Sequence, residues 1–61
     1  MTKEQIKEIR TKLGLSQMQF SKLLNVGIAT VSRWELGISK PSNMAIEKLE
    51  SYLDIQVNEQ S

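Results

Sequence analysis

The chain has 61 residues, a net charge of +1 and a hydrophobic fraction of 39%. This length allows one small domain, which buries only about 60% of the surface that its unfolded chain exposes. Because the chain contains no Cys and no His, disulfides, the usual zinc sites and the common nucleophile–base pairs of enzymes are excluded. We therefore expect a single non-enzymatic domain over residues 1–61, without metal or cofactor, built from a few packed helices.

The charges are distributed unevenly along the chain. Residues 1–40 carry seven Lys or Arg and three acids, whereas residues 41–61 carry one Lys and four acids. A positive body with an acidic end suits a protein that meets a polyanion with one side, although ordinary solvated faces give the same counts. No apolar run reaches the length of a membrane span, and residues 1–10 lack the apolar core of a signal peptide. We expect a cytoplasmic protein.

A first helix is predicted to follow Thr2. Thr2 and Gln5 have the spacing of a capping box, in which each side chain accepts a hydrogen bond from the other residue's backbone N–H. Apolar residues, Ile6 and Ile9 first, then recur at helical spacing. Gly14 is expected to end this helix because glycine adopts the left-handed conformation without a steric clash.

Residues 16–37 predict two short helices joined by a tight corner. Ser16 and Gln19 form a second capping box, which predicts a helix over about 17–24. Asn25 suits the corner because its short polar side chain tolerates a left-handed backbone. A further helix is predicted over about 28–36. This arrangement is that of a helix-turn-helix, in which the first helix braces the second against the edges of DNA bases.

The helix over 28–36 is predicted to have two unlike faces. Val31 and Trp34 are three residues apart and are expected to face the core, and Phe20 of the preceding helix is expected to join them. We interpret both aromatic residues as core side chains and not as stacking platforms for bases. The remaining side chains are mostly small or polar, and a helix with such a face can enter a major groove.

A fourth helix is predicted after Pro41, which blocks continuation of the third. Ser42 is the expected cap, and apolar residues follow at helical spacing: Ala45, Ile46, Leu49, Tyr52 and Leu53. The spacing ends at Leu53, so residues 54–61 are expected to form a short polar tail. The predicted fold class is all-α, a compact bundle of four or five short helices with a central helix-turn-helix.

The sequence resembles the lambda-repressor-like, Cro-type helix-turn-helix family, and most closely the domains of phage repressors and of antitoxins from toxin–antitoxin pairs. The resemblance covers about residues 3–53. It rests on Arg10, on the run LGLSQ at 13–17, on the run VSRWE at 31–35 followed by Gly37, and on Pro41. The chain departs from the family's usual residues at Ser21, Asn25 and Gly27. Gly27 replaces a Ser or Thr cap, which brings the backbone closer to a phosphate or loosens the start of the helix.

The resemblance implies base contacts from the outer face of the helix over 28–36. The candidates are Ile28, Ala29, Thr30 and Arg33. Arg33 has the strongest chemical basis because its guanidinium group can bond both acceptors of a guanine in the major groove. Its alternatives are a phosphate contact or an ion pair. For Ile28, contact with a thymine methyl group and burial in the core are equally supported.

Phosphate contacts are expected around this helix. Gln17 begins a helix, where backbone N–H groups favour an anion, and the resemblance implies a phosphate contact there; the alternative is a plain exposed glutamine. Lys22 fits a phosphate contact and a solvated surface equally well. The full set of phosphate candidates is Gln17, Lys22, Gly27, Ser32, Lys40, Ser42 and Asn43.

The resemblance also implies an internal salt bridge between Arg10 and Glu35, which would fix the recognition helix on the first helix. A homodimer is expected, with the dimer interface at the end of the chain: Tyr52, Leu53, Ile55 and Val57.

The leading hypothesis is a sequence-specific DNA-binding transcriptional regulator, a repressor that binds a palindromic operator on double-stranded DNA as a homodimer and is held on the nucleoid by that binding. The alternative is an antitoxin-like or anti-repressor module whose main partner is a protein.

Overall fold

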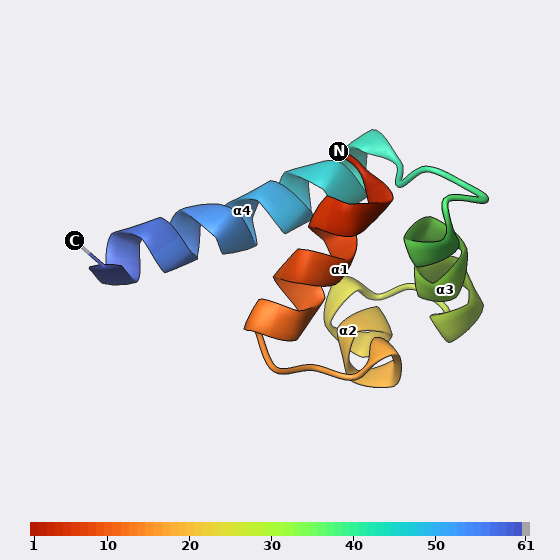
Figure 1. The fold of residues 1–61 in the computed structure, drawn as a ribbon, viewed down its shortest axis with the longest axis horizontal. Helices are drawn as coiled ribbons and strands as arrows, with labels where there is room; N and C mark the ends of the chain where they lie inside the picture. The colour runs from red at the N-terminus through yellow and green to blue at the C-terminus, as the bar shows by residue number, and fades with distance from the viewer. Residues whose placement is uncertain (61) are drawn as a thin grey trace.

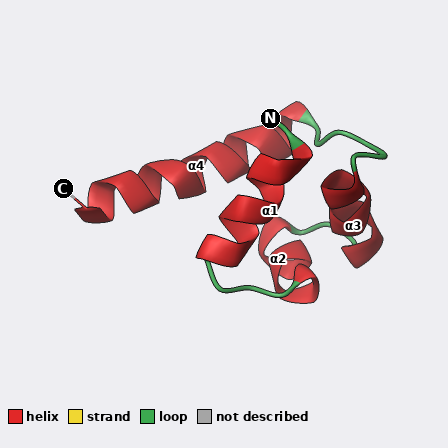
Figure 2. Ribbon diagram, in the orientation of Figure 1, coloured by secondary structure: helices red, strands yellow, loops and turns green. Residues whose placement is uncertain are grey.

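The computed structural model describes the backbone of residues 1–60 and the side chains of residues 1–53. Four α-helices occupy this part of the chain, and no strand is found in it (Figure 2). Their bounds are α1 Lys3–Lys12, α2 Gln17–Leu24, α3 Ile28–Leu36 and α4 Asn43–Gln60. Helices α1, α2 and α3 lie together, and α4 starts beside α1 and then leaves the group (Figure 1). The prediction of an all-α fold with a central helix-turn-helix is confirmed.

The starts of α1 and α2 are fixed by the two predicted capping boxes. Thr2 Oγ1 accepts from the backbone N–H of Gln5 at 3.1 Å, and the Gln5 side chain accepts from the backbone N–H of Thr2 at 2.8 Å. Ser16 and Gln19 form the equivalent pair at 3.1 and 2.9 Å. Each box satisfies backbone N–H groups that the first helical turn leaves without partners, so the sequence itself determines where these helices begin.

The corner between α2 and α3 turns at Asn25. Its backbone is left-handed, with φ 59° and ψ 46°, which Asn adopts more readily than other residues with a Cβ. The N–H of the next residue, Val26, returns to the carbonyl of Ser21 at 2.9 Å. Ser21 is buried, and Val26 packs against the core. The corner therefore closes α2 and sets the direction in which α3 leaves.

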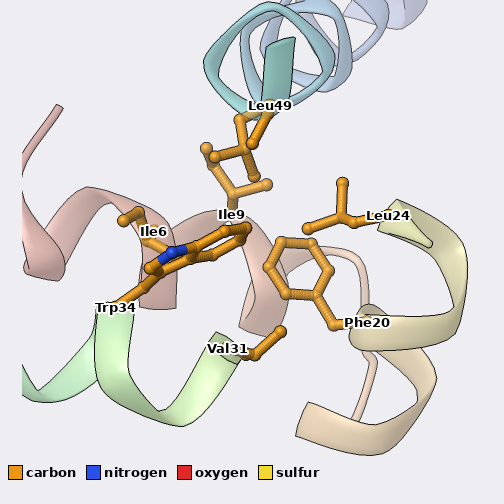
Figure 3. Close-up of a cluster of buried hydrophobic side chains, with 8 residues drawn as sticks. Ile6, Ile9, Phe20, Leu24, Val31, Trp34 and Leu49 are labelled. Carbon is orange, nitrogen blue, oxygen red and sulfur yellow. The ribbon is translucent and has the colours of Figure 1, made fainter. Parts of the chain in front are cut away.

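All four helices contribute to one hydrophobic core. Phe20 and Val31 are fully buried, and Trp34 is 4% exposed. Figure 3 shows these side chains gathered around Ile9 of α1, with Leu49 of α4 reaching the same cluster. The buried members of the cluster are Ile6, Ile9, Phe20, Leu24, Val31, Trp34, Ala45 and Leu49. The two aromatic residues are thus core side chains, as expected from their spacing.

Helix α4 is longer than the apolar spacing indicates. It continues past Leu53 to Gln60, through residues that we expected to form only a polar tail. Residues 54–60 contain neither Pro nor Gly, so backbone chemistry does not end the helix where its apolar stripe ends. This half of α4 extends away from the other helices (Figure 1).

Among the described side chains of α4, those of residues 43–53, Ala45 and Leu49 are buried, at 8% and 0% exposed. Within residues 1–60, none of the helices combines the length and hydropathy that a membrane-spanning segment needs.

Candidate nucleic-acid interface

Helix α3 has one face in the core and one face in solvent. Val31 and Trp34 hold it to the interior. On the other side, Ala29 and Arg33 are exposed and Ile28 is 46% exposed. The alternative that Ile28 belongs to the core is therefore excluded. Arg33 is thus accessible to a partner on this face.

Two further polar residues of α3 lie at the margins of this face. Thr30 and Ser32 are both half-buried. Thr30, predicted to contact bases, and Ser32, predicted to contact phosphate, thus expose only part of their side chains. Their contacts with DNA stay predictions.

The N-terminal end of α3 has no side-chain cap. Gly27 is the capping residue, and no side chain accepts a hydrogen bond from the first turn. The Gly27 carbonyl accepts from the N–H groups of Thr30 and Val31 at 3.0 and 3.3 Å. The N–H groups of the first turn point out of the helix, where the helix dipole favours an anion. This end of α3 is therefore compatible with the expected phosphate contact at Gly27.

An ion pair attaches α3 to α1. Arg10 Nε donates to Glu35 Oε2 at 2.7 Å, and Arg10 Nη2 donates to Glu35 Oε1 at 3.1 Å. The two side chains are only 14% and 6% exposed. Arg10 Nη1 also donates to the Leu15 carbonyl at 2.9 Å, which ties in the segment before α2. A two-bonded pair of this kind fixes orientation as well as distance, so it holds α3 at a set angle on α1.

Gln17 extends the same network to the start of α2. Its Nε2 donates to Glu35 Oε1 at 3.2 Å. This bond was not predictable from local spacing, because the two residues are 18 positions apart and lie on different helices. An amide nitrogen has two hydrogens, so Gln17 keeps a second donor for the phosphate contact that the resemblance implies.

The network keeps Glu35 ionised. Burial alone would raise the pKa of its carboxyl group, but the hydrogen bonds from Arg10 and Gln17, together with the charges of Arg10 and Lys7, outweigh burial and lower the pKa below its ordinary value of 4.5. The carboxylate form is the one that accepts all three hydrogen bonds. Near neutral pH, both members of the Arg10–Glu35 ion pair are therefore charged.

The remaining phosphate candidates are on the surface. Lys22 lies in the last turn of α2, and Lys40 lies in the loop after α3. Ser42 and Asn43 are exposed at the start of α4, where Ser42 Oγ accepts from the N–H of Ala45 at 3.3 Å. All of these residues are accessible to a polyanion, and their roles stay predictions.

The expected dimer residues fall into two groups. Tyr52 is half-buried and packs against the core of its own chain, whereas Leu53 is 36% exposed. The side chains of Ile55 and Val57 lie outside the described residues. Of Tyr52 and Leu53, Leu53 therefore has the more accessible side chain for contact with a second copy of the chain.

Comparison with known proteins gives one match. A family model described as Helix-turn-helix matches residues 6–60, which is nearly the whole chain. The match begins within α1, covers α2, α3 and α4, and includes Arg10 and Glu35. Among curated proteins and solved structures, no significant match to the chain was found.

Proposed function

The chain belongs to the lambda-repressor-like helix-turn-helix family of DNA-binding regulators, and from this premise we propose that it is a transcriptional repressor that binds a palindromic operator as a homodimer. Helix α3 would enter the major groove and contact bases through Ile28, Ala29, Thr30 and Arg33. The start of α2, the loop after α3 and the start of α4 would contact the flanking phosphates.

The observation that carries this proposal is the exposed face of α3. A recognition helix needs a rigid attachment on one side and a free surface on the other. Val31 and Trp34 supply the attachment by burial, and Glu35 supplies it by its bonds to Arg10 and Gln17. Arg33, which lies between these residues in the sequence, has its side chain exposed to solvent. Its fork of donors matches the two acceptors on the major-groove edge of guanine.

A dimer follows from the small number of bases that one such helix can reach. Two copies related by a two-fold axis would place their recognition helices one turn of DNA apart, roughly 34 Å, and so require a palindromic site. The second half of α4 projects from the body of the protein (Figure 1). We propose that this segment, with Leu53 at its start, forms the contact between the copies.

Selection of bound duplexes from a random DNA pool tests this proposal. We expect the recovered sequences to share a palindrome with half-sites about one helical turn apart. A single half-site would retain DNA recognition but contradict the dimer. Recovery of no preferred sequence, together with a stoichiometric protein partner in a pull-down, would favour the alternative of a protein-binding module.

The salt dependence of binding is a second test. Each phosphate contact releases condensed counterions, so the logarithm of the association constant should fall linearly with the logarithm of the salt concentration, with a slope of about −0.9 per contact. Titration of the selected duplex at several KCl concentrations measures this slope. Binding that does not respond to salt would contradict the proposed phosphate contacts.

A further inference from the structure

A groove of about 360 Å³ lies between the start of α1, the end of α3 and the loop that follows α3. Its lining includes three buried residues, Ile6, Trp34 and Pro41, and two exposed lysines, Lys3 and Lys40. The N-terminus of the chain lies close to the start of α4 in the same region (Figure 1). The groove thus combines an apolar base with cationic sides.

The Lys3 side chain passes close to Gly37 at one side of this groove. A Cβ built on Gly37 would lie 3.1 Å from Lys3 Cδ and 3.8 Å from Lys3 Nζ. The lysine side chain therefore crosses the position that a larger residue would fill. Its ammonium group lies near the C-terminal end of α3, where the helix dipole favours a positive charge.

The charge of the groove is positive. Neither Lys3 nor Lys40 takes part in an ion pair among residues 1–53, where the ion pairs are Arg10–Glu35 and Glu8–Lys12. Glu4 is the one acid that lines the groove. Two lysines and one acid in the lining leave a net positive charge, which is complementary to an anion such as a DNA phosphate.

The groove is also continuous with the surface assigned to DNA. Lys40 belongs to both, because it lines the groove and lies in the loop that leads from α3 to the expected phosphate contacts of α4. We propose that the groove binds one further phosphate of the DNA backbone, with Lys3 on one side and Lys40 on the other. The inference rests on the proposed DNA binding and extends the contact surface to the first helix.

The test uses the full chain with Lys3→Met, which keeps an unbranched side chain over Gly37 and removes its charge. Lys12→Met is the matched control, since it removes the same charge from the other end of α1, where Lys12 pairs with Glu8 at 3.0 Å. Affinity for the selected duplex and for a random duplex is measured at several KCl concentrations. We expect Lys3→Met to lower both affinities equally and to reduce the salt slope by about 0.9 per bound protomer. Lys12→Met and Lys3→Arg should keep the original slope.

An unchanged slope in Lys3→Met would overturn the inference. If the same variant also had a lower melting temperature, Lys3 would act only on the end of α3, as a structural cation. These outcomes are distinct from failure of the proposed function. If the original protein bound neither duplex, DNA binding itself would be refuted, and the groove would lose its proposed ligand with it.

Discussion

At the scale of single residues, the Arg10–Glu35 pair is the contact on which the position of α3 depends most. Replacing Arg10 by Met would leave the Glu35 carboxylate in a largely buried site with Gln17 as its remaining side-chain partner. We expect the free energy of unfolding to fall by about 3 kcal/mol, the typical effect of removing one member of a buried pair. Urea denaturation monitored by tryptophan fluorescence measures this free energy, because Trp34 is buried in the folded protein.

Lys12→Met is again the matched control. The Glu8–Lys12 pair has side chains that are 61% and 53% exposed, and exposed pairs contribute about 0–1 kcal/mol. Equal losses of stability in Arg10→Met and Lys12→Met would show that the Arg10 network does not hold α3 in place.

The pKa of Glu35 predicts how this contribution changes with pH. Because the pKa is lower in the folded protein than in the unfolded chain, the unfolded state binds more protons at acidic pH and stability falls there. The contribution is complete above pH 4.5 and is lost as the pH falls through the lowered pKa. We therefore expect the difference in unfolding free energy between the original protein and Glu35→Gln to be largest at neutral pH and to shrink below pH 4.5. A difference that stays constant from neutral pH to acid would contradict this assignment.

The residues of this network were accessible to sequence reasoning to different degrees. The pairing of Arg10 with Glu35 came from the family resemblance, since no local spacing connects residues on different helices. The bond from Gln17 was not foreseen, because its position at the start of α2 indicated only an anion contact. Burial of Phe20 and Trp34, in contrast, followed directly from helical spacing.

At the scale of elements, α3 lies between two glycines that tolerate a side chain to different degrees. Gly27 has an ordinary extended backbone, and a Cβ there would meet only Thr30 Oγ1, at 3.9 Å. Gly37 has φ 78°, and a Cβ there would lie 3.1 Å from Lys3 Cδ. Gly27→Ser should raise the unfolding free energy by a few tenths, roughly 0.3 kcal/mol, by adding a side-chain cap. Gly37→Ala should lower it by about 1 kcal/mol or more.

Thermal unfolding of the two variants checks this prediction, and Gly27→Ala serves as the control that adds a Cβ without an oxygen. Stabilisation by Ala as large as that by Ser would mean that chain entropy, and not capping, produces the gain. A neutral Gly37→Ala would mean that the left-handed turn and the Lys3 contact are easily displaced.

The helices were predictable where their ends carry local signals. Thr2 and Ser16 determine the starts of α1 and α2 through their capping boxes, and Gly37 ends α3 in a left-handed conformation. The end of α4 carried no such signal. Apolar spacing indicates which face of a helix packs on the core and carries no signal for where the helix ends, so the predicted end at Leu53 was too early.

At the scale of the whole molecule, the fold separates a monomer core from a projecting segment. Ala45 and Leu49 join the first part of α4 to the core, and the backbone of residues 54–60 extends beyond the body (Figure 1). A chain that stops after Leu53 should therefore keep a melting temperature close to that of the full chain at concentrations where both are monomers. It should fail to dimerise at higher concentrations. Sedimentation equilibrium of both chains measures this, and a truncated chain that still dimerises would place the interface elsewhere.

The central claim is that the exposed face of α3 reads DNA sequence through Arg33. The direct measurement compares the original protein with Arg33→Ala on the selected operator, on operators changed at one base pair, and on random duplex, at one salt concentration. We expect a loss of about 1–3 kcal/mol on the operator, relaxed discrimination at one base pair, and nearly unchanged affinity for random DNA. An equal loss on the operator and on random DNA, or no loss on either, would contradict it.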